Sequence, residues 1–420
     1  MVEIEVNDLV EIKKNGRVYR GIVMPHHAFS SKNIILIKLE NGYNIGIDKR
    51  NAKIKLIKKG RKHKKLEKEI PYDEKKPTIA LIGTGGTIAS YVDYETGAVH
   101  PATTSQELVS AVPEIFELCN VEAKVLLQKL SENIVPKDWV KMARKAAKEL
   151  NKGKAGIVIS HGTDTMAYSG AALAFMLKNL RGPVVFVGSQ RSSDRPSSDA
   201  FDNLAAGVKV ALSDIGEVVV VMHAGISSGK CLIHRATKVR KMHSSRRNAF
   251  VSINDEPIGV VEDGVKFLSG YRKKSDEKTI AKTKLNENVA LIYYYPGMKN
   301  DDFERFADGK DGIVIAGTGL GHVGEGLIKS IRKLIRNGVP VVMTTQCLNG
   351  TVNMNVYSTG RKLIKAGVVD GKDMLPEVAL VKLMWVLANE DNVEKAMQRN
   401  IAGEIKERRL ITPISPPENK

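Results

Sequence analysis

The sequence has few cysteines, few aromatic residues and no long apolar run. Its three cysteines, Cys119, Cys231 and Cys347, lie far apart and form neither a metal-binding pattern nor a disulfide framework, which favours a reducing compartment. No stretch approaches the ~18 uninterrupted apolar residues of a membrane-spanning helix, and the acidic, alternating N-terminus is unlike a signal peptide. Neither secretion nor membrane spanning is expected, and the cytoplasm is the predicted location.

Two glycine patterns lack the partner residues that would make them cofactor sites. The turn 83–87 follows an apolar strand but has no phosphate-loop lysine, and the pattern at 319–324 is not followed by the acidic residue that would hold a ribose. The histidines His223, His234 and His243 have no metal-ligand spacing. The sequence therefore predicts no metal and no cofactor held by this chain.

Basic residues outnumber acidic ones, and the surplus is concentrated near the N-terminus. The chain has 65 Lys and Arg against 47 Asp and Glu, a net charge of +18, which favours an anionic partner. Residues 1–76 hold 19 Lys and Arg and 10 Asp and Glu, so half of the net charge lies in under a fifth of the length. The densest run, 53–68, is interpreted either as a solvated linker or as a docking surface for a partner or for phosphates.

The N-terminal segment has the pattern of a small all-β domain. Short alternating stretches at 8–12, 18–23, 34–39 and 43–47 read as strands, and Asn15-Gly16 and Asn41-Gly42 have the composition of hairpin turns. We expect a small β-barrel-like domain over residues 1–70, with a basic exit linker that ends at about residue 76.

From residue 77 onward, short apolar strands alternate with helical stretches, which predicts parallel α/β sheets. Strands are expected at 79–82, 157–160, 184–187 and 218–222, with helices over 139–150 and 169–180. A polar stretch without apolar periodicity separates two α/β domains, 77–270 and 289–420, and is interpreted as a linker at 271–288. The second series has strands near 289–295, 312–316 and 339–344, with helices near 326–337 and 376–388.

Two hydroxyl-bearing turns follow strands of the first series. Thr87 lies on the glycine turn, and Thr163 and Asp164 lie in the turn after strand 157–160. Ligands of open α/β sheets bind at the carboxyl ends of strands, so both turns are expected at one crevice. A third segment, 235–241, is basic and carries Lys238. Each segment alone is as compatible with an ordinary turn or a solvated basic face as with catalysis.

Together and in order, three segments resemble the catalytic motifs of the L-asparaginase/glutaminase family. They are Gly85-Gly86-Thr87-Ile88-Ala89, His161-Gly162-Thr163-Asp164-Thr165-Met166 and Thr237-Lys238. Further similarity at 188–204, 295–297, 317–321 and 345–353 extends the resemblance over roughly residues 77–405. The resemblance implies a two-domain asparaginase-like α/β body.

The basic β domain in front of that body narrows the resemblance to the asparaginase-like subunits of archaeal tRNA-dependent amidotransferases. In that family, the asparaginase-like subunit releases ammonia from glutamine. A partner, the E subunit, binds Glu-tRNA(Gln), activates it with ATP and Mg²⁺, and accepts the ammonia. The resemblance also implies a homodimer within a heterotetramer, with tRNA recognised mainly through the partner.

The resemblance assigns roles to individual residues. Thr87 is expected to be the nucleophile that attacks the side-chain amide, and Thr163, Asp164 and Lys238 are expected to form a hydrogen-bonded relay. Ser131, Glu132, Gly86 and Gly162 are expected to contact the substrate. Backbone N–H groups of the turn 83–86 and of the Gly162 turn are candidates to stabilise an oxyanion. A free lysine is neutral only about once in 2,500 molecules at pH 7, so burial would have to lower the pKa of Lys238 if it acts as a base.

Two other interpretations remain open at this point. A stand-alone cytoplasmic L-asparaginase would use the same motifs, but the first 76 residues speak against it. An RNA-binding or scaffold protein that has lost activity would not need the full set of Thr87, Thr163, Asp164 and Lys238.

Overall fold

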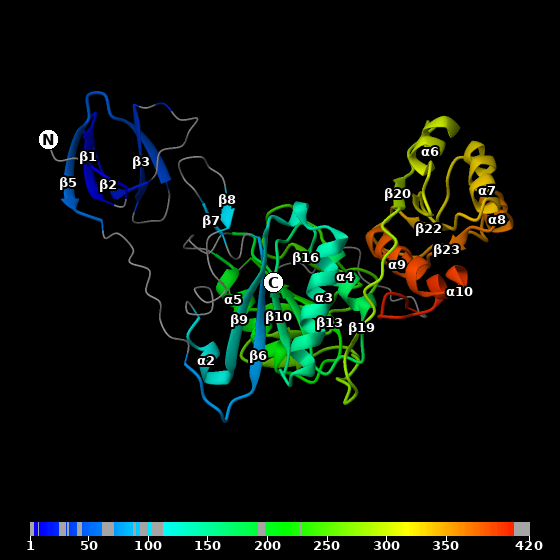
Figure 1. Cartoon of the computed structure of the whole chain (residues 1–420). Coiled ribbons are helices and arrows are strands. Elements are labelled where there is room, and N and C mark those ends of the chain that lie inside the picture. Colours follow the sequence, from blue (N-terminus) through cyan, green and yellow to red (C-terminus); the bar gives the residue numbers. More distant parts are fainter. Residues whose placement is uncertain are drawn as a thin grey trace.

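The computed structural model describes most of the chain, and Figure 1 shows three parts that follow one another in sequence: an all-β sheet, a large mixed sheet with helices, and a smaller parallel sheet with helices. The described residues are 4–6, 8–24, 31, 33–39, 44–60, 71–86, 90–92, 99–101, 112–191, 198–226 and 229–406. Thr87 and the second predicted hairpin turn, Asn41-Gly42, lie outside these residues.

The N-terminal part is a five-stranded antiparallel sheet in the order β4-β3-β2-β1-β5. Its strands are β1 (Leu9–Lys14), β2 (Arg17–Val23), β3 (Ile34–Leu39), β4 (Asn44–Asp48) and β5 (Lys53–Lys58). Asn15 and Gly16 connect β1 to β2 with φ values of 48° and 73°, the left-handed backbone that a two-residue hairpin needs. The predicted all-β character and this turn are confirmed.

Of the two interpretations of the basic run, the linker is wrong for residues 53–58, which belong to this sheet. Residues 61–68 of the run lie outside the described residues. Strand β5 pairs with β1, with Ile54 opposite Ile12 and Leu56 opposite Val10. Ile54 and Leu56 pack against the small core of this sheet, while Lys53 and Lys55 are exposed. The alternation was present in the sequence, but the density of lysines hid it.

The largest sheet has eight strands in the order β18-β17-β14-β13-β12-β10-β6-β9. The five strands from β9 to β13 are parallel neighbours, and β14, β17 and β18 continue the sheet antiparallel. The strands are β6 (Thr78–Gly85), β9 (Asn120–Lys129), β10 (Ile157–Ser160), β12 (Val184–Val187), β13 (Val218–His223), β14 (Cys231–Arg235), β17 (Gly259–Val261) and β18 (Val265–Phe267). Short pairs form outside it: β7 (Ser90–Val92) with β8 (Val99–Pro101), β11 (Leu177–Lys178) with β19 (Ile280–Ala281), and β15 (Val239–Lys241) with β16 (Phe250–Ser252).

The C-terminal sheet has four parallel strands, β20 (Val289–Tyr293), β21 (Gly312–Gly317), β22 (Val341–Thr345) and β23 (Val369–Asp370), in sequence order. The α-helices of the described residues are α2 (Ile115–Leu118), α3 (Pro136–Asn151), α4 (Met166–Met176), α5 (Ala200–Ala211), α6 (Asn300–Ala307), α7 (Ile328–Arg336), α8 (Ser358–Ala366), α9 (Pro376–Asn389) and α10 (Val393–Gln398). The described residues also form two 3₁₀ turns, Ser131–Asn133 and Glu325–Leu327.

One hydrophobic core joins the two α/β parts. Helices α4 and α9 are apolar around most of their circumference and pack against each other, α4 over the large sheet and α9 over the C-terminal sheet (Figure 1). Phe175 of α4 and Trp385 of α9 are among the largest buried side chains. The predicted arrangement, an α/β body with two sheets behind an all-β domain, is confirmed.

Candidate active site

The glycine turn and the Thr163 turn meet at the carboxyl edge of the large sheet. Strands β6 and β10 are parallel neighbours, with Gly83 opposite Ser160. Gly86 has a φ of +81°, and a Cβ built on it would overlap the backbone nitrogen of Gly162. Only glycine allows this left-handed backbone and this close approach, so the two predicted motifs touch main chain to main chain. Thr87 is the next residue but lies outside the described part of the chain.

Ser131 lies beside both turns. It begins a 3₁₀ turn after β9, and its backbone carbonyl accepts a hydrogen bond of 2.7 Å from the Thr165 hydroxyl. A Cβ on Gly162 would lie 2.7 Å from the Ser131 Cβ, and the Ser131 hydroxyl is 3.5 Å from an Asp164 carboxylate oxygen. Ser131 is buried, whereas Glu132 is exposed. The structure thus brings Ser131 to the site, and the substrate-binding roles of both residues stay predictions.

The lysine that completes this cluster is Lys241, and the prediction that Lys238 does so is wrong. The Lys241 ammonium donates hydrogen bonds of 2.9 Å to the Thr163 hydroxyl and 2.6 Å to the Asp164 carboxylate. The Lys238 ammonium is fully buried and instead donates a hydrogen bond of 2.7 Å to the Asp373 carboxylate.

The alternation of an extended strand explains why the two lysines point apart. The β15–β16 ladder extends back to Lys238, whose carbonyl accepts a hydrogen bond from the Ile253 N–H. Successive side chains of such a strand face opposite sides, so Lys238 and Arg240 share one side and Lys241 takes the other. Arg240 indeed pairs with Glu377 of α9 at 3.1 Å, on the side of the C-terminal sheet.

Burial lowers the pKa of Lys238, and the nearby Asp373 carboxylate opposes this shift without cancelling it. The Asp373 carboxylate also accepts a hydrogen bond of 3.1 Å from the Lys406 N–H, and its backbone carbonyl accepts one from the Asn254 amide. Lys238 therefore belongs to a buried polar junction between the two α/β parts. Its ammonium serves this junction and has no contact with Thr163 or Asp164.

The Gly86 N–H is also already occupied. It donates a hydrogen bond of 3.2 Å to the Lys129 carbonyl, so it is not free to stabilise an oxyanion as predicted. The Gly162 N–H, by contrast, donates to no acceptor within the described residues. Of the two predicted donors, Gly162 is the one that the local geometry leaves available.

Two buried histidines make stability depend on pH. Burial lowers the pKa of His161, which lies next to Gly162, and of His234 to about 4 each. In the unfolded chain the pKa of a histidine is about 6.5. Below that pH the two side chains are therefore protonated in the unfolded state but stay neutral in the folded state. We expect each histidine to lower the free energy of unfolding by about 1 kcal/mol between pH 6.5 and pH 5.5.

Urea unfolding at these two pH values measures this loss. His234→Gln should remove about half of the pH dependence that the two histidines cause, whereas His243→Gln, at an exposed position, is the matched control. Equal pH dependence in the wild type and in His234→Gln would contradict the expectation.

Comparison with known proteins matches family models to three segments of the chain. The model described as "GatD N-terminal domain" matches residues 4–57, "Asparaginase, N-terminal" matches 78–272, and "Glutaminase/Asparaginase C-terminal domain" matches 288–399. The D subunit of the glutamyl-tRNA(Gln) amidotransferase of Pyrococcus furiosus is 52% identical over 96% of this chain and 95% of its own length. The D subunit of the Saccharolobus solfataricus enzyme is 50% identical over 98% and 95%. The chain belongs to the family of amidotransferase D subunits.

Solved structures of L-asparaginases cover the α/β body of this D-subunit family member. The thermostable L-asparaginase from Thermococcus kodakarensis superposes with a TM-score of 0.71 and 34% identity, covering 79% of this chain and 100% of its own. L-asparaginase I from Vibrio cholerae gives 0.69 and 29%, covering 79% and 99%. The N-terminal match to the D-subunit domain is therefore the feature that these asparaginases do not account for.

Among the described residues, no group of three or more His, Cys, Asp or Glu side chains is arranged to hold a metal ion. No described helix is long and apolar enough to cross a membrane. The predicted absence of a cofactor stays a prediction.

Sequence reasoning missed Lys241 and Asp373. The signal for Lys241 was strand alternation, since a residue three positions after Lys238 faces the opposite side. Nothing local to Asp373 marks it, because its partner lies 135 positions away in the sequence.

Proposed function

We propose that the chain is the glutaminase subunit of a tRNA-dependent amidotransferase. It releases ammonia from glutamine so that a partner, corresponding to the E subunit, converts Glu-tRNA(Gln) to Gln-tRNA(Gln) with ATP and Mg²⁺. The observation that carries this proposal is the contact of Lys241 with Thr163 and Asp164 beside the Gly86 turn, in a chain that also has the D-subunit N-terminal domain. A stand-alone L-asparaginase accounts for the first feature but not for the second.

The proposed chemistry starts at Thr87. Its hydroxyl attacks the side-chain amide carbon of glutamine, the C–N bond breaks, and ammonia leaves from a glutamyl ester of Thr87. Water then attacks this ester and releases glutamate. Both steps need a group that takes a proton from the attacking hydroxyl or water and returns one to the leaving group.

The Thr163, Asp164 and Lys241 cluster supplies that proton path. The Thr163 oxygen accepts from the Lys241 ammonium, which leaves the Thr163 hydroxyl hydrogen available for donation. The Asp164 carboxylate accepts a hydrogen bond from the same ammonium and is largely exposed, so it connects the proton path to solvent. Gly162 is the proposed oxyanion donor, and Ser131 and Glu132 are proposed to hold the substrate.

Assembly with a partner follows from the same proposal. Ammonia is mostly protonated at neutral pH and ammonium has no lone pair, so the product must pass directly to the acceptor. We propose a homodimer of this chain within a heterotetramer, located in the cytoplasm, where the three free thiols of the chain stay reduced. In this assembly the partner makes most of the contacts with tRNA, and the basic N-terminal domain of this chain binds the partner.

Stimulated glutamine hydrolysis tests the proposed function. We expect slow hydrolysis by the isolated chain and at least about a tenfold rise in kcat when the partner, ATP with Mg²⁺ and Glu-tRNA(Gln) are all present, because binding of the acceptor assembles the site. Ammonia release, measured with and without each component, is the readout. Rapid hydrolysis of asparagine by the isolated chain, with no response to these additions, would identify a stand-alone asparaginase instead.

A further inference from the structure

A recess lies at the amino edge of the large sheet, away from the Thr163 cluster. It has a volume of about 270 Å³, and Glu217 and Val218 at the start of β13 form part of its wall. Because β10 and β13 run in the same direction, this edge is opposite the one that carries Thr163. We call this recess the linker pocket; its polar lining residues include Lys178, Asn179, Glu217, Arg272 and Ser275.

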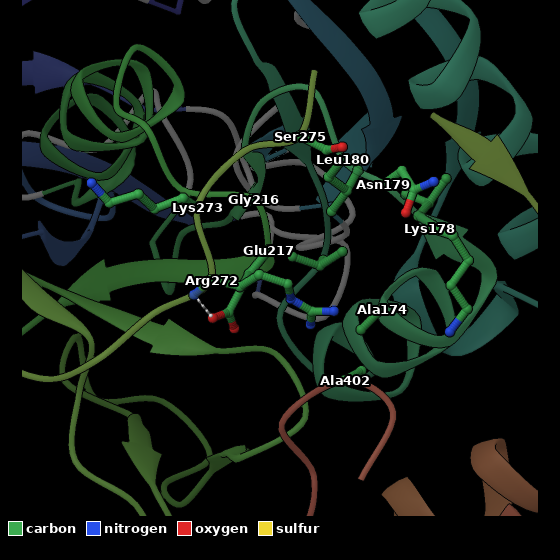
Figure 2. Close-up of a pocket in the computed structure, with 12 residues that line it drawn as sticks. Ala174, Lys178, Asn179, Leu180, Gly216, Glu217, Arg272, Lys273, Ser275 and Ala402 are labelled. Atoms are coloured by element: carbon green, nitrogen blue, oxygen red, sulfur yellow. Dashed lines mark hydrogen bonds between the residues drawn. The ribbon is translucent and has the colours of Figure 1, made fainter. Parts of the chain in front are cut away.

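Two basic side chains line this pocket, those of Lys178 and Arg272. In Figure 2 the Arg272 guanidinium lies near Ala174 and Ala402, the Lys178 amine lies on the other side of Ala174, and the Lys273 side chain is directed away. The Lys178 ammonium lies 4.9 Å from the centre of the Trp385 ring, which fixes its position. Burial lowers the pKa of Lys178 to about 8, and repulsion from Arg272, Lys282 and Arg399 adds to the shift, against an opposing effect of Glu404.

The carboxylates around the pocket are already engaged. Glu217 accepts hydrogen bonds of 2.7 and 3.1 Å from the Arg235 guanidinium and one of 2.6 Å from the Arg272 N–H. Glu404 is fully buried and pairs with Lys382 at 2.6 Å, and Glu390 pairs with Arg399. Within the described residues, Lys178, Arg272 and Lys282 have no carboxylate partner within 4 Å.

We propose that the linker pocket binds a small phosphate-bearing anion. A guanidinium offers a planar pair of N–H donors that fits two phosphate oxygens, and a lysine adds a compact point charge. A dianion matches the charge of Lys178 and Arg272 together, whereas a single carboxylate would leave part of this charge uncompensated. The volume is close to the lower limit of about 300 Å³ that is usual for small-molecule sites, which suits a phosphate ion or a phosphate monoester.

Calorimetric titration of the full chain with inorganic phosphate and with pyrophosphate, at constant ionic strength in chloride, tests the proposal. We expect saturable binding with a dissociation constant below about 1 mM, and a loss of at least about tenfold in affinity in Arg272→Gln and in Lys178→Gln. Lys273→Gln is the matched control, since that side chain points away from the pocket and pairs with Asp214, and its affinity should stay within about twofold. The unfolding temperature of each variant shows that it is folded.

A single-stranded oligoribonucleotide distinguishes the source of the phosphate. If it binds, competes with inorganic phosphate and loses affinity in Arg272→Gln, the phosphate belongs to an RNA backbone; if it fails to compete, the pocket serves a free phosphate or monoester. The proposal is overturned if neither phosphate nor pyrophosphate binds at about 10 mM, tenfold above the expected dissociation constant, or if both variants bind as tightly as the wild type. Because binding is measured directly, this outcome does not depend on the glutaminase proposal.

Discussion

Replacing Lys241 with methionine is expected to lower kcat for glutamine hydrolysis by about 10³-fold. Methionine nearly matches the length of lysine but cannot donate the two hydrogen bonds that hold Thr163 and Asp164. Without the ammonium, the Thr163 oxygen loses its donor and the Asp164 carboxylate loses its counter-charge. Steady-state ammonia release by the assembled enzyme measures the effect.

The variant Lys238→Met tests which lysine completes the relay: Lys241, as the structure indicates, or Lys238, as the sequence predicts. Lys238 has no contact with Thr163 or Asp164, so its variant, assayed well below its unfolding temperature, should retain kcat within about tenfold of the wild type. Thr87→Val provides the inactive reference, and Lys241→Arg tests whether charge and donors suffice. A complete loss in Lys238→Met together with a normal rate in Lys241→Met would restore Lys238 to the relay.

Lys238→Met is expected to lower the free energy of unfolding by about 3 to 5 kcal/mol. The substitution leaves the Asp373 carboxylate in a buried junction without its ammonium, and only N–H donors such as that of Lys406 remain. An uncompensated buried charge costs far more than the intact pair contributes. Urea unfolding followed by circular dichroism gives the difference, with a constant m value as the check that the same transition is observed.

The double variant Lys238→Met with Asp373→Leu is the control for this effect. Removing both charges should recover more than half of the loss, because the penalty comes from the orphaned carboxylate. Two losses that simply add would show that the ion pair is not the cause. Lys230→Met, at an exposed lysine that pairs with the equally exposed Glu262, should change stability by less than about 1 kcal/mol.

Much of the fold was predictable because local patterns and the tertiary structure agree. The strands 157–160 and 184–187 begin and end where the apolar runs do, and Asn15-Gly16 forms the expected hairpin. Helix α4 was predicted at 169–180 but spans Met166–Met176, because it is apolar on all sides and its pattern marks no boundary. Leu177 and Lys178 instead form β11, whose partner strand lies about a hundred residues away.

The strand pattern was enough to predict that the hydroxyl-bearing turns follow parallel strands, and therefore that Gly86, Gly162 and Thr163 share one edge of a sheet. Which lysine reaches that edge depends on packing between distant segments. Lys238 and Lys241 are chemically alike and three residues apart, so composition and motif cannot distinguish them. The packing of β15 between the site and the C-terminal sheet distinguishes the two lysines. It directs the Lys238 ammonium toward Asp373 and the Lys241 ammonium toward Thr163 and Asp164.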